Sequence, residues 1–249
     1  MLEIKGISKA FGGIRAVSDC TLELKHYTIT GLIGPNGSGK TTLFNLITGS
    51  IPPDSGKIYF EGKRLDGHLP HEVAWRGIIR TFQLTRIFPK MTVLENMLLA
   101  PHHQTGEGLW PLLVKRKKMQ EEERKNQKKA LELIEWVGLL HLKDQFAENL
   151  SYGQQKLLEL MRALMADPKM ILLDEPTAGI NPSLIRKIIE LILKMTELGK
   201  VFFIIEHNMD VVIELCDWVF ALDNGEKIAE GRPKEVQNDP RVIEAYLGV

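Results

Sequence analysis

The chain has 249 residues, a formal net charge of zero, 44% hydrophobic residues and 26% charged residues. These values are ordinary for a globular protein with a substantial core, and the balanced charge argues against binding nucleic acid through a basic surface. No signal peptide is visible, no apolar run approaches the ~20 residues that span a bilayer, and the cysteines lack metal-ligand spacing. We therefore expect a protein that is soluble by itself and reaches a membrane only through a partner.

A phosphate-binding loop is the first motif along the chain. Residues 34–41 read GPNGSGKT and match G-x-x-x-x-G-K-[ST], between an expected strand at 28–33 and an expected helix at 42–48. Glycines let backbone N–H groups turn toward anionic oxygens, and the following helix presents its positive N-terminus. Lys40 would then reach the β- and γ-phosphates of a nucleoside triphosphate, and the Thr41 hydroxyl would bind Mg²⁺. The residues expected to contact the nucleotide here are Gly34, Pro35, Asn36, Gly37, Ser38, Gly39, Lys40, Thr41 and Thr42.

The next part of the chain changes from strand-like to helical character. Residues 58–65 predict a hairpin that turns at Glu61 and Gly62. From about residue 86 the pattern is helical, and residues 115–129 form the most charged stretch of the chain. We interpret this stretch as a solvated helix face, with contact to lipid headgroups or to a partner as the alternative.

Apolar strands and amphipathic helices alternate again after residue 151. Residues 170–173 and 201–205 are short apolar runs, as expected of parallel strands that are buried on both faces. The helix between them carries an apolar stripe, formed by Leu184, Ile185, Ile188, Ile189, Ile192 and Met195. The sequence therefore predicts an α/β core that a helical insertion interrupts.

Two consecutive carboxylates follow the first of these strands. Asp174 and Glu175 come directly after the apolar run, and Pro176 ends the strand. Carboxylates at the end of a buried strand are costly unless something pairs with them, and Mg²⁺ and a water molecule would do so. Asp174 suits the metal, directly or through water, and Glu175 suits polarising an attacking water.

A second helix N-terminus suited to an anion begins at residue 151. The sequence LSYGQ at 150–154 offers Ser151 as an N-cap, and Gly153 permits close approach of the backbone. Apolar residues continue at helical spacing, at Leu157, Leu160, Met161 and Leu164. A plain capped helix is the alternative interpretation of this segment.

Taken in order, GPNGSGKT, LSYGQ, ILLDEPTAG and a strand before His207 resemble the ATP-binding cassette (ABC) ATPases over the whole chain. The resemblance implies an α/β P-loop NTPase with a mainly parallel core sheet, an N-terminal antiparallel β subdomain and an inserted helical subdomain. Residues 1–249 would form one ABC ATPase domain, with the core and β subdomain at 1–85 and 155–249 and the helical subdomain at about 86–154. ATP and Mg²⁺ are the implied ligands.

The resemblance also implies roles for single residues. Gln83 is similar to the glutamine that touches Mg²⁺ or the attacking water and couples the site to membrane subunits. His207 is similar to the switch histidine that contacts the γ-phosphate, and Phe11 to the aromatic residue that stacks on adenine. The signature residues that contact phosphate are Ser151, Gly153 and Gln154. Two departures from the common pattern are Tyr152, in place of glycine, and Asn181, where aspartate is more frequent.

The branch of the family follows from further segments. Residues 81–88, 91–96, 205–209 and 242–248 are similar to those of ATP-binding subunits of high-affinity branched-chain amino-acid importers. The implied partners are a second ATPase subunit meeting this one head to tail, two integral-membrane permease subunits and, indirectly, a solute-binding protein. The implied location is the cytoplasmic face of the cell membrane. The alternatives are an importer of urea or short amides, an exporter, a soluble ABC ATPase and an ATP-gated module that does not hydrolyse ATP.

Overall fold

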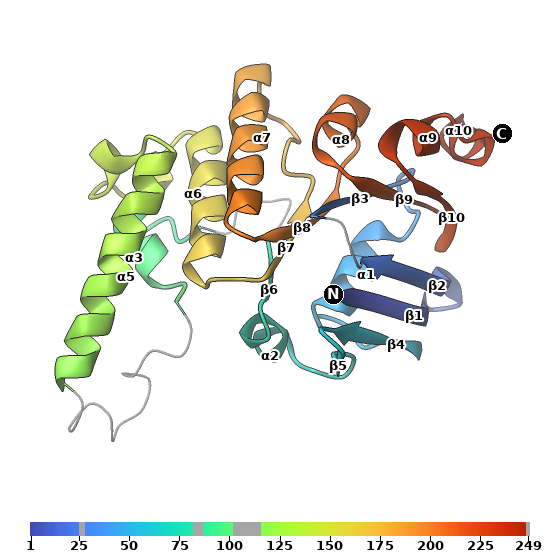
Figure 1. Ribbon diagram of the computed structural model, residues 1–249, viewed down its shortest axis with the longest axis horizontal. Helices are drawn as coiled ribbons and strands as arrows, with labels where there is room; N and C mark the ends of the chain where they lie inside the picture. Colours follow the sequence, from blue (N-terminus) through green and yellow to red (C-terminus); the bar gives the residue numbers. More distant parts are fainter. Residues whose placement is uncertain (25–27, 82–86, 102–115, 248–249) are drawn as a thin grey trace. The chain divides into compact units, whose positions relative to one another are not determined.

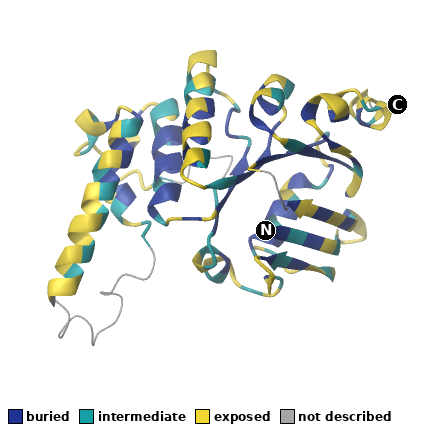
Figure 2. Ribbon diagram, in the orientation of Figure 1, coloured by how far each residue is buried: buried dark blue, intermediate teal, exposed yellow. Residues whose placement is uncertain are grey.

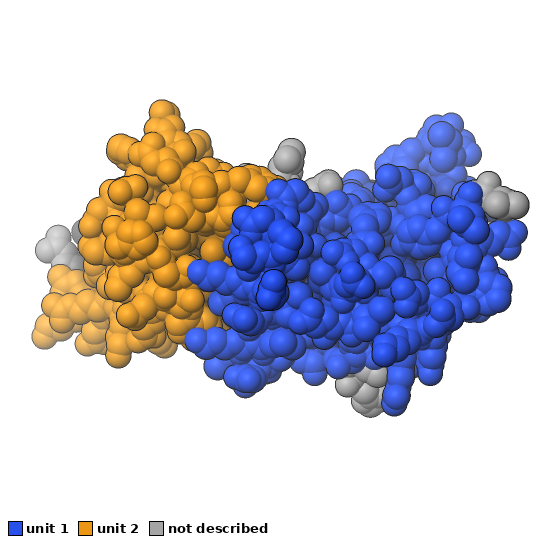
Figure 3. Space-filling view, turned by 90° about the horizontal axis from the view of Figure 1, so that it is seen from above, with its two compact units in different colours: residues 1–83, 169–249 blue, residues 84–168 orange. Residues whose placement is uncertain are grey.

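The computed structural model describes residues 1–24, 28–81, 87–101 and 116–247. Its contacts divide the chain into a first unit, residues 1–83 with 169–249, and a second unit, residues 84–168 (Figure 3). The sequence places the end of the helical segment near residue 154, whereas the second unit runs to 168. The difference has a physical cause, because the helix that follows residue 151 packs against the other helices of the second unit.

The first unit contains two β-sheets (Figure 1). The antiparallel sheet has the order β2-β1-β4-β5, and the larger sheet has the order β10-β9-β3-β8-β7-β6. The strands are β1 Leu2–Phe11, β2 Ile14–Leu24, β3 Ile29–Ile33, β4 Ser55–Phe60, β5 Lys63–Arg64, β6 Ile78–Arg80, β7 Met170–Asp174, β8 Val201–Ile205, β9 Trp218–Asp223 and β10 Glu226–Gly231. In the larger sheet β6, β7, β8, β3 and β9 pair in parallel, and β10 pairs antiparallel with β9. The predicted mainly parallel core and N-terminal antiparallel sheet are therefore confirmed.

Helices flank these sheets and form the second unit. In the first unit they are α1 Lys40–Ile47, α2 Pro70–Trp75, α7 Pro182–Glu197, α8 Met209–Leu215, α9 Pro233–Gln237 and α10 Pro240–Leu247. The second unit contains α3 Val93–Leu98, α5 Arg116–Trp136, α6 Tyr152–Met165 and the 3₁₀ turns η2 Leu140–Leu142 and η3 Ala147–Asn149. Helix α6 packs on α3 and α5. Within the described residues, no helix is both long and apolar enough to cross a membrane.

Helix α1 shares one hydrophobic core with both sheets of the first unit. Phe44 lies 5.1 Å, between ring centroids, from Phe203 of β8. The same cluster includes Ile4 and Ile7 of the antiparallel sheet. Burial of apolar area on both sides therefore fixes the helix that follows the phosphate loop (Figure 2).

Local sequence explains two of the predicted elements. The β4–β5 hairpin turns through Glu61 at φ 51° and Gly62 at φ 76°, which is the left-handed pair that a two-residue hairpin turn requires. Helix α7 begins where the Asn181 side chain accepts a hydrogen bond from the Leu184 N–H at 2.9 Å. The predicted stripe of α7 is buried at Ile188, Ile189, Ile192 and Met195, and half-buried in the first turn at Leu184 and Ile185.

The parallel strands decide where the polar motifs meet. Strands β3, β8 and β7 are neighbours in the sheet and run in the same direction. Their carboxyl ends therefore lie at one edge of the sheet, which is where ligands bind in folds of this kind. The phosphate loop follows β3, Glu206 and His207 follow β8, and Glu175 follows β7.

Candidate functional site

The phosphate loop encloses the amine of Lys40. The Lys40 Nζ donates hydrogen bonds to the carbonyl oxygens of Gly34 and Pro35, both at 2.8 Å, and to the Ser38 hydroxyl at 3.3 Å. Lys40 is only 6% exposed. Burial lowers the pKa of Lys40, and the nearby carboxylates of Glu175 and Asp174 act in the opposite direction. The loop therefore holds a buried cationic group beside two carboxylates.

Two glycines of the loop are required by close backbone contacts. At Gly34, with φ 147°, a Cβ atom would lie 2.1 Å from the Leu222 carbonyl oxygen. At Gly39, with φ 98°, it would lie 2.2 Å from the Ala16 carbonyl oxygen. Any side chain at either position would displace backbone, so the motif glycines fix the path of the loop.

A pocket of about 180 Å³ brings the phosphate loop together with two predicted catalytic residues. Its lining is Ala16, Asn36, Gly37, Gly39, Lys40, Thr41, Thr42, Glu175 and His207. The His207 Nε2 lies 2.9 Å from the Glu175 Oε1. Glu175 has φ 48°, and its N–H donates to the Ile205 carbonyl at 3.0 Å. A non-glycine residue in this left-handed conformation is strained, and such strain is common at functional sites.

Asp174, the predicted metal ligand, forms a buried ion pair with an arginine. The Arg80 Nη2 lies 2.6 Å from the Asp174 Oδ2, and the two side chains are 5% and 7% exposed. The Arg80 Nη1 also donates to the Asn45 side-chain oxygen at 2.6 Å. The pair thus joins the ends of β6 and β7 to helix α1.

The other predicted residues that the structure describes in the first unit lie at the end of β1 and in the first turn of α1. Phe11 ends β1 and is 47% exposed, with the Lys9 Nζ 5.6 Å from its ring centroid. Thr41 and Thr42 lie in the first turn of α1 and line the pocket. Gln83 lies outside the described residues, so its role stays a prediction.

The signature residues lie in the second unit, at the N-terminus of α6. Ser151 is the N-cap of that helix, as predicted. Its hydroxyl accepts from the Gln154 N–H at 3.3 Å, and the Gln154 side chain accepts from the Ser151 N–H at 2.9 Å. Gly153 lies in the first turn, next to Tyr152, whose ring is partly exposed. The predicted apolar positions Leu157, Leu160, Met161 and Leu164 are buried.

Comparison with known proteins decides the family. The model of the family described as ABC transporter matches residues 17–178. The chain belongs to this family. As an ABC cassette it binds ATP and is an ATPase, so the predicted fold and enzyme class are confirmed.

Similar proteins match the cassette over its whole length. It is 42% identical over 248 residues to the protein named "Probable branched-chain amino acid transport ATP-binding protein LivG" of Archaeoglobus fulgidus, covering 100% of this chain and 95% of that protein. A crystal structure of a nucleotide-free ATP-binding cassette matches with a TM-score of 0.85 and 40% identity, covering 100% and 99% of the two chains. A dimeric cassette in a post-hydrolysis state with ADP and phosphate matches with a TM-score of 0.76 and 26% identity, covering 94% and 99%. The family described as branched-chain amino acid ATP-binding cassette transporter matches residues 226–249.

Sequence reasoning missed Glu206 of the cassette. This carboxylate is 3% exposed; one oxygen accepts from the His207 N–H at 3.0 Å and the other from the Thr177 hydroxyl. It therefore joins the segment after β8 to the segment after β7. The available signal was a glutamate at the end of a buried apolar run, where a charge needs hydrogen-bond partners.

Arg80 was also missed, and its pair with Asp174 predicts a large effect on stability. Arg80→Met should leave the Asp174 carboxylate buried without its partner and lower the free energy of unfolding by about 3–5 kcal/mol. Urea unfolding followed by circular dichroism measures this. The control is Lys90→Met, because Lys90 and its partner Glu148 are 83% and 38% exposed, and this variant should lose less than about 1 kcal/mol. Equal losses of unfolding free energy in the two variants would show that the buried Arg80 pair stabilises the fold no more than an exposed pair does.

Proposed function

We propose that this cassette hydrolyses ATP to drive the import of branched-chain amino acids through membrane-embedded permease subunits. The observation that carries the catalytic part is the 2.9 Å contact between Glu175 and His207 in the pocket that Lys40 and the phosphate loop line. The choice of solute is supported by the full-length similarity to LivG and by the match at residues 226–249.

In this proposal the phosphate loop binds the nucleotide through its backbone N–H groups and Lys40. Residues 34–42 surround the phosphates, the Lys40 amine turns to the β- and γ-phosphate oxygens, and the partly exposed Phe11 ring stacks on adenine. The loop carbonyls that Lys40 now bonds would be released at that step. Desolvation of the amine strengthens its attraction to phosphate.

The residues present fit a magnesium ion that travels with ATP. Thr41, Asp174 and Gln83 supply the hydroxyl, carboxylate and amide oxygens that Mg²⁺ prefers, Asp174 directly or through water. No group of three or more His, Cys, Asp and Glu side chains suited to a metal occurs among the described residues. That fits a cation that takes most of its ligands from phosphates and water. When bound, Mg²⁺ supplies positive charge that stabilises the phosphoryl oxygens as the bond to the leaving group breaks.

Glu175 would act as the general base. Its carboxylate accepts a proton from the attacking water, while His207 holds that carboxylate in place and contacts the γ-phosphate. Glu206 fixes the backbone of His207 through the N–H bond at 3.0 Å. The oxygen of that water would bond to the γ-phosphorus as the bond from the γ-phosphorus to the β-phosphate oxygen breaks, so that ADP and inorganic phosphate leave and Glu175 gives its proton to solvent.

A second ATPase subunit would complete the site. Its Ser151, Gly153 and Gln154 equivalents would meet the γ-phosphate at the N-terminus of a capped helix, and ATP would hold the two subunits together until hydrolysis releases them. The dimeric relative with ADP and phosphate supports this arrangement. Gln83 and the second unit would pass the motion to two permease subunits at the cytoplasmic face of the membrane. A solute-binding protein would deliver the cargo to the permeases.

Solute competition tests the proposed cargo. The cassette, its partner ATPase and the two permeases are reconstituted in vesicles and supplied with the solute-binding protein and ATP. We expect ATP-dependent accumulation of labelled leucine that isoleucine and valine compete away and urea does not. Accumulation of urea or a short amide, with leucine excluded, would reassign the cassette to the related importers.

A further inference from the structure

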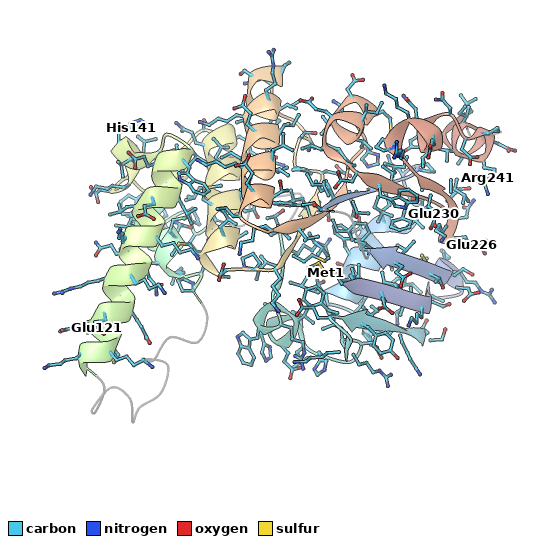
Figure 4. All side chains as sticks on the ribbon, viewed as in Figure 1. Met1, Glu121, His141, Glu226, Glu230 and Arg241 are labelled. Atoms are coloured by element: carbon cyan, nitrogen blue, oxygen red, sulfur yellow. The ribbon has the colours of Figure 1, made fainter. Side chains whose placement is uncertain are left out.

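The C-terminal helix contacts the first residue of the phosphate loop. Tyr246 lies in the last turn of α10, the helix that begins beside the Arg241 side chain labelled in Figure 4. The Tyr246 hydroxyl oxygen accepts a hydrogen bond from the Gly34 N–H at 2.9 Å. These residues are 212 positions apart in the sequence. No local pattern in the sequence predicts this contact.

The Tyr246 hydroxyl can accept the Gly34 hydrogen bond throughout the physiological pH range. Tyr246 is 43% exposed as a whole, and burial raises its pKa above the ordinary value for tyrosine. The group therefore stays a neutral hydroxyl at physiological pH. Helix α10 is held in place by Val242, which is buried, and by packing on α9 and β10.

A second contact joins the C-terminal part of the chain to the same loop. Gly225, in the turn between β9 and β10, donates its N–H to the Ser38 carbonyl oxygen at 3.1 Å. The Gly225 carbonyl in turn accepts from the Ser18 N–H at 2.9 Å. The loop is thus held near its beginning by Tyr246 and near its end by Gly225.

Gly34 makes two hydrogen bonds, one through its N–H to Tyr246 and one through its carbonyl to Lys40, and the second would be lost when Lys40 binds phosphate. Its carbonyl accepts from the Lys40 Nζ, which uses its three N–H groups on Gly34, Pro35 and Ser38. Lys40 must give up some of these bonds to reach a phosphate, and Gly34 then keeps the bond to Tyr246. The remaining bond would hold the loop in its binding conformation at the moment when the internal one is lost.

We propose that Tyr246 is a positioning residue for nucleotide binding, through the hydrogen bond from its hydroxyl to the first glycine of the phosphate loop. This inference rests on the proposed phosphate-binding role of Lys40. It assigns a function to the C-terminal helix: the helix sets the affinity of the loop for nucleotide without touching the nucleotide. By linkage, nucleotide binding then also stabilises the docked helix.

The test measures how tightly Tyr246 variants bind ADP, and it separates the role of the hydroxyl from that of the ring. ADP binding requires neither hydrolysis nor a partner subunit. Tyr246→Phe keeps the ring and removes the acceptor, so we expect the Kd for ADP, measured by titration calorimetry, to rise about 3- to 10-fold. The thermal midpoint without nucleotide should stay close to that of the wild type, and the Gly34 amide should exchange its hydrogen faster. Tyr59→Phe, on β4, is the matched control and should bind ADP like the wild type.

A Tyr246→Phe variant that binds ADP with wild-type affinity would overturn the inference. If Tyr246→Ala then bound ADP weakly, the ring and not the hydroxyl would be the group that matters. A wild-type protein that binds no ADP would contradict the proposed phosphate loop itself, which separates the failure of the proposed function from that of Tyr246.

Discussion

Replacing Glu175 by Gln should lower the ATP turnover of the assembled complex by about 100- to 10,000-fold, the usual contribution of general acid–base catalysis. The amide keeps the size of the side chain and one acceptor oxygen but cannot take a proton from water. Because the phosphate loop is unchanged, ATP should still bind with near wild-type affinity. Phosphate release under saturating ATP measures the turnover, and equilibrium binding measures the affinity.

The same variant should accumulate in the ATP-bound state. Without hydrolysis, nucleotide stays between the two ATPase subunits, so gel filtration with ATP should show a larger share of the associated form. Glu190→Gln, an exposed glutamate on α7, is the matched control and should turn over ATP at the wild-type rate. Turnover by Glu175→Gln at the rate of this control would mean that another group accepts the proton.

Replacing Lys40 by Ala should act on binding rather than on the chemical step alone. The amine is expected to make charge-assisted hydrogen bonds to phosphate, and one such bond contributes about 1.5–3 kcal/mol. We therefore expect ADP to bind about 10- to 150-fold more weakly, and turnover to be lost at ordinary ATP concentrations. Titration calorimetry measures the affinity, and circular dichroism checks that the variant is folded.

The control for this substitution is Lys63→Ala, because Lys63 is an exposed residue of β5. It should leave ADP affinity unchanged. If Lys40→Ala bound ADP as tightly as Lys63→Ala, the hydrogen bonds of Lys40 to Gly34 and Pro35 would be its main role, and the amine would be a structural part of the loop.

Sequence reasoning located the parts of the site that depend on local patterns. The spacing of glycines around Lys40 needs no tertiary information, and neither does a buried strand that ends at Asp174. Apolar strands alternating with helices predict that these strands are parallel. That β3, β8 and β7 are neighbours, so that the motifs meet at one sheet edge, is shown by the structure. The Ser151 cap was predictable for the same reason, because an N-cap acts within its own helix turn.

What sequence reasoning could not find are contacts between distant side chains. Arg80 pairs with Asp174 across 94 positions, and Tyr246 reaches Gly34 across 212. Periodicity describes one element at a time, so it does not predict which carboxylate Arg80 meets. The extent of the second unit to residue 168 is likewise a tertiary property, because the packing of α6 on α3 and α5 involves three separate segments.

In the proposed function, ATP hydrolysis by this chain drives import. The most direct test measures uptake of labelled leucine by the reconstituted complex, with Glu175→Gln in place of the wild-type cassette. The vesicles contain the same permeases, partner ATPase, solute-binding protein and ATP in each case, and Glu190→Gln is the parallel control. We expect ATP-dependent accumulation with the wild type and with Glu190→Gln, and none above the ATP-free background with Glu175→Gln. Equal accumulation by all three complexes would contradict the proposal that hydrolysis at this site drives import.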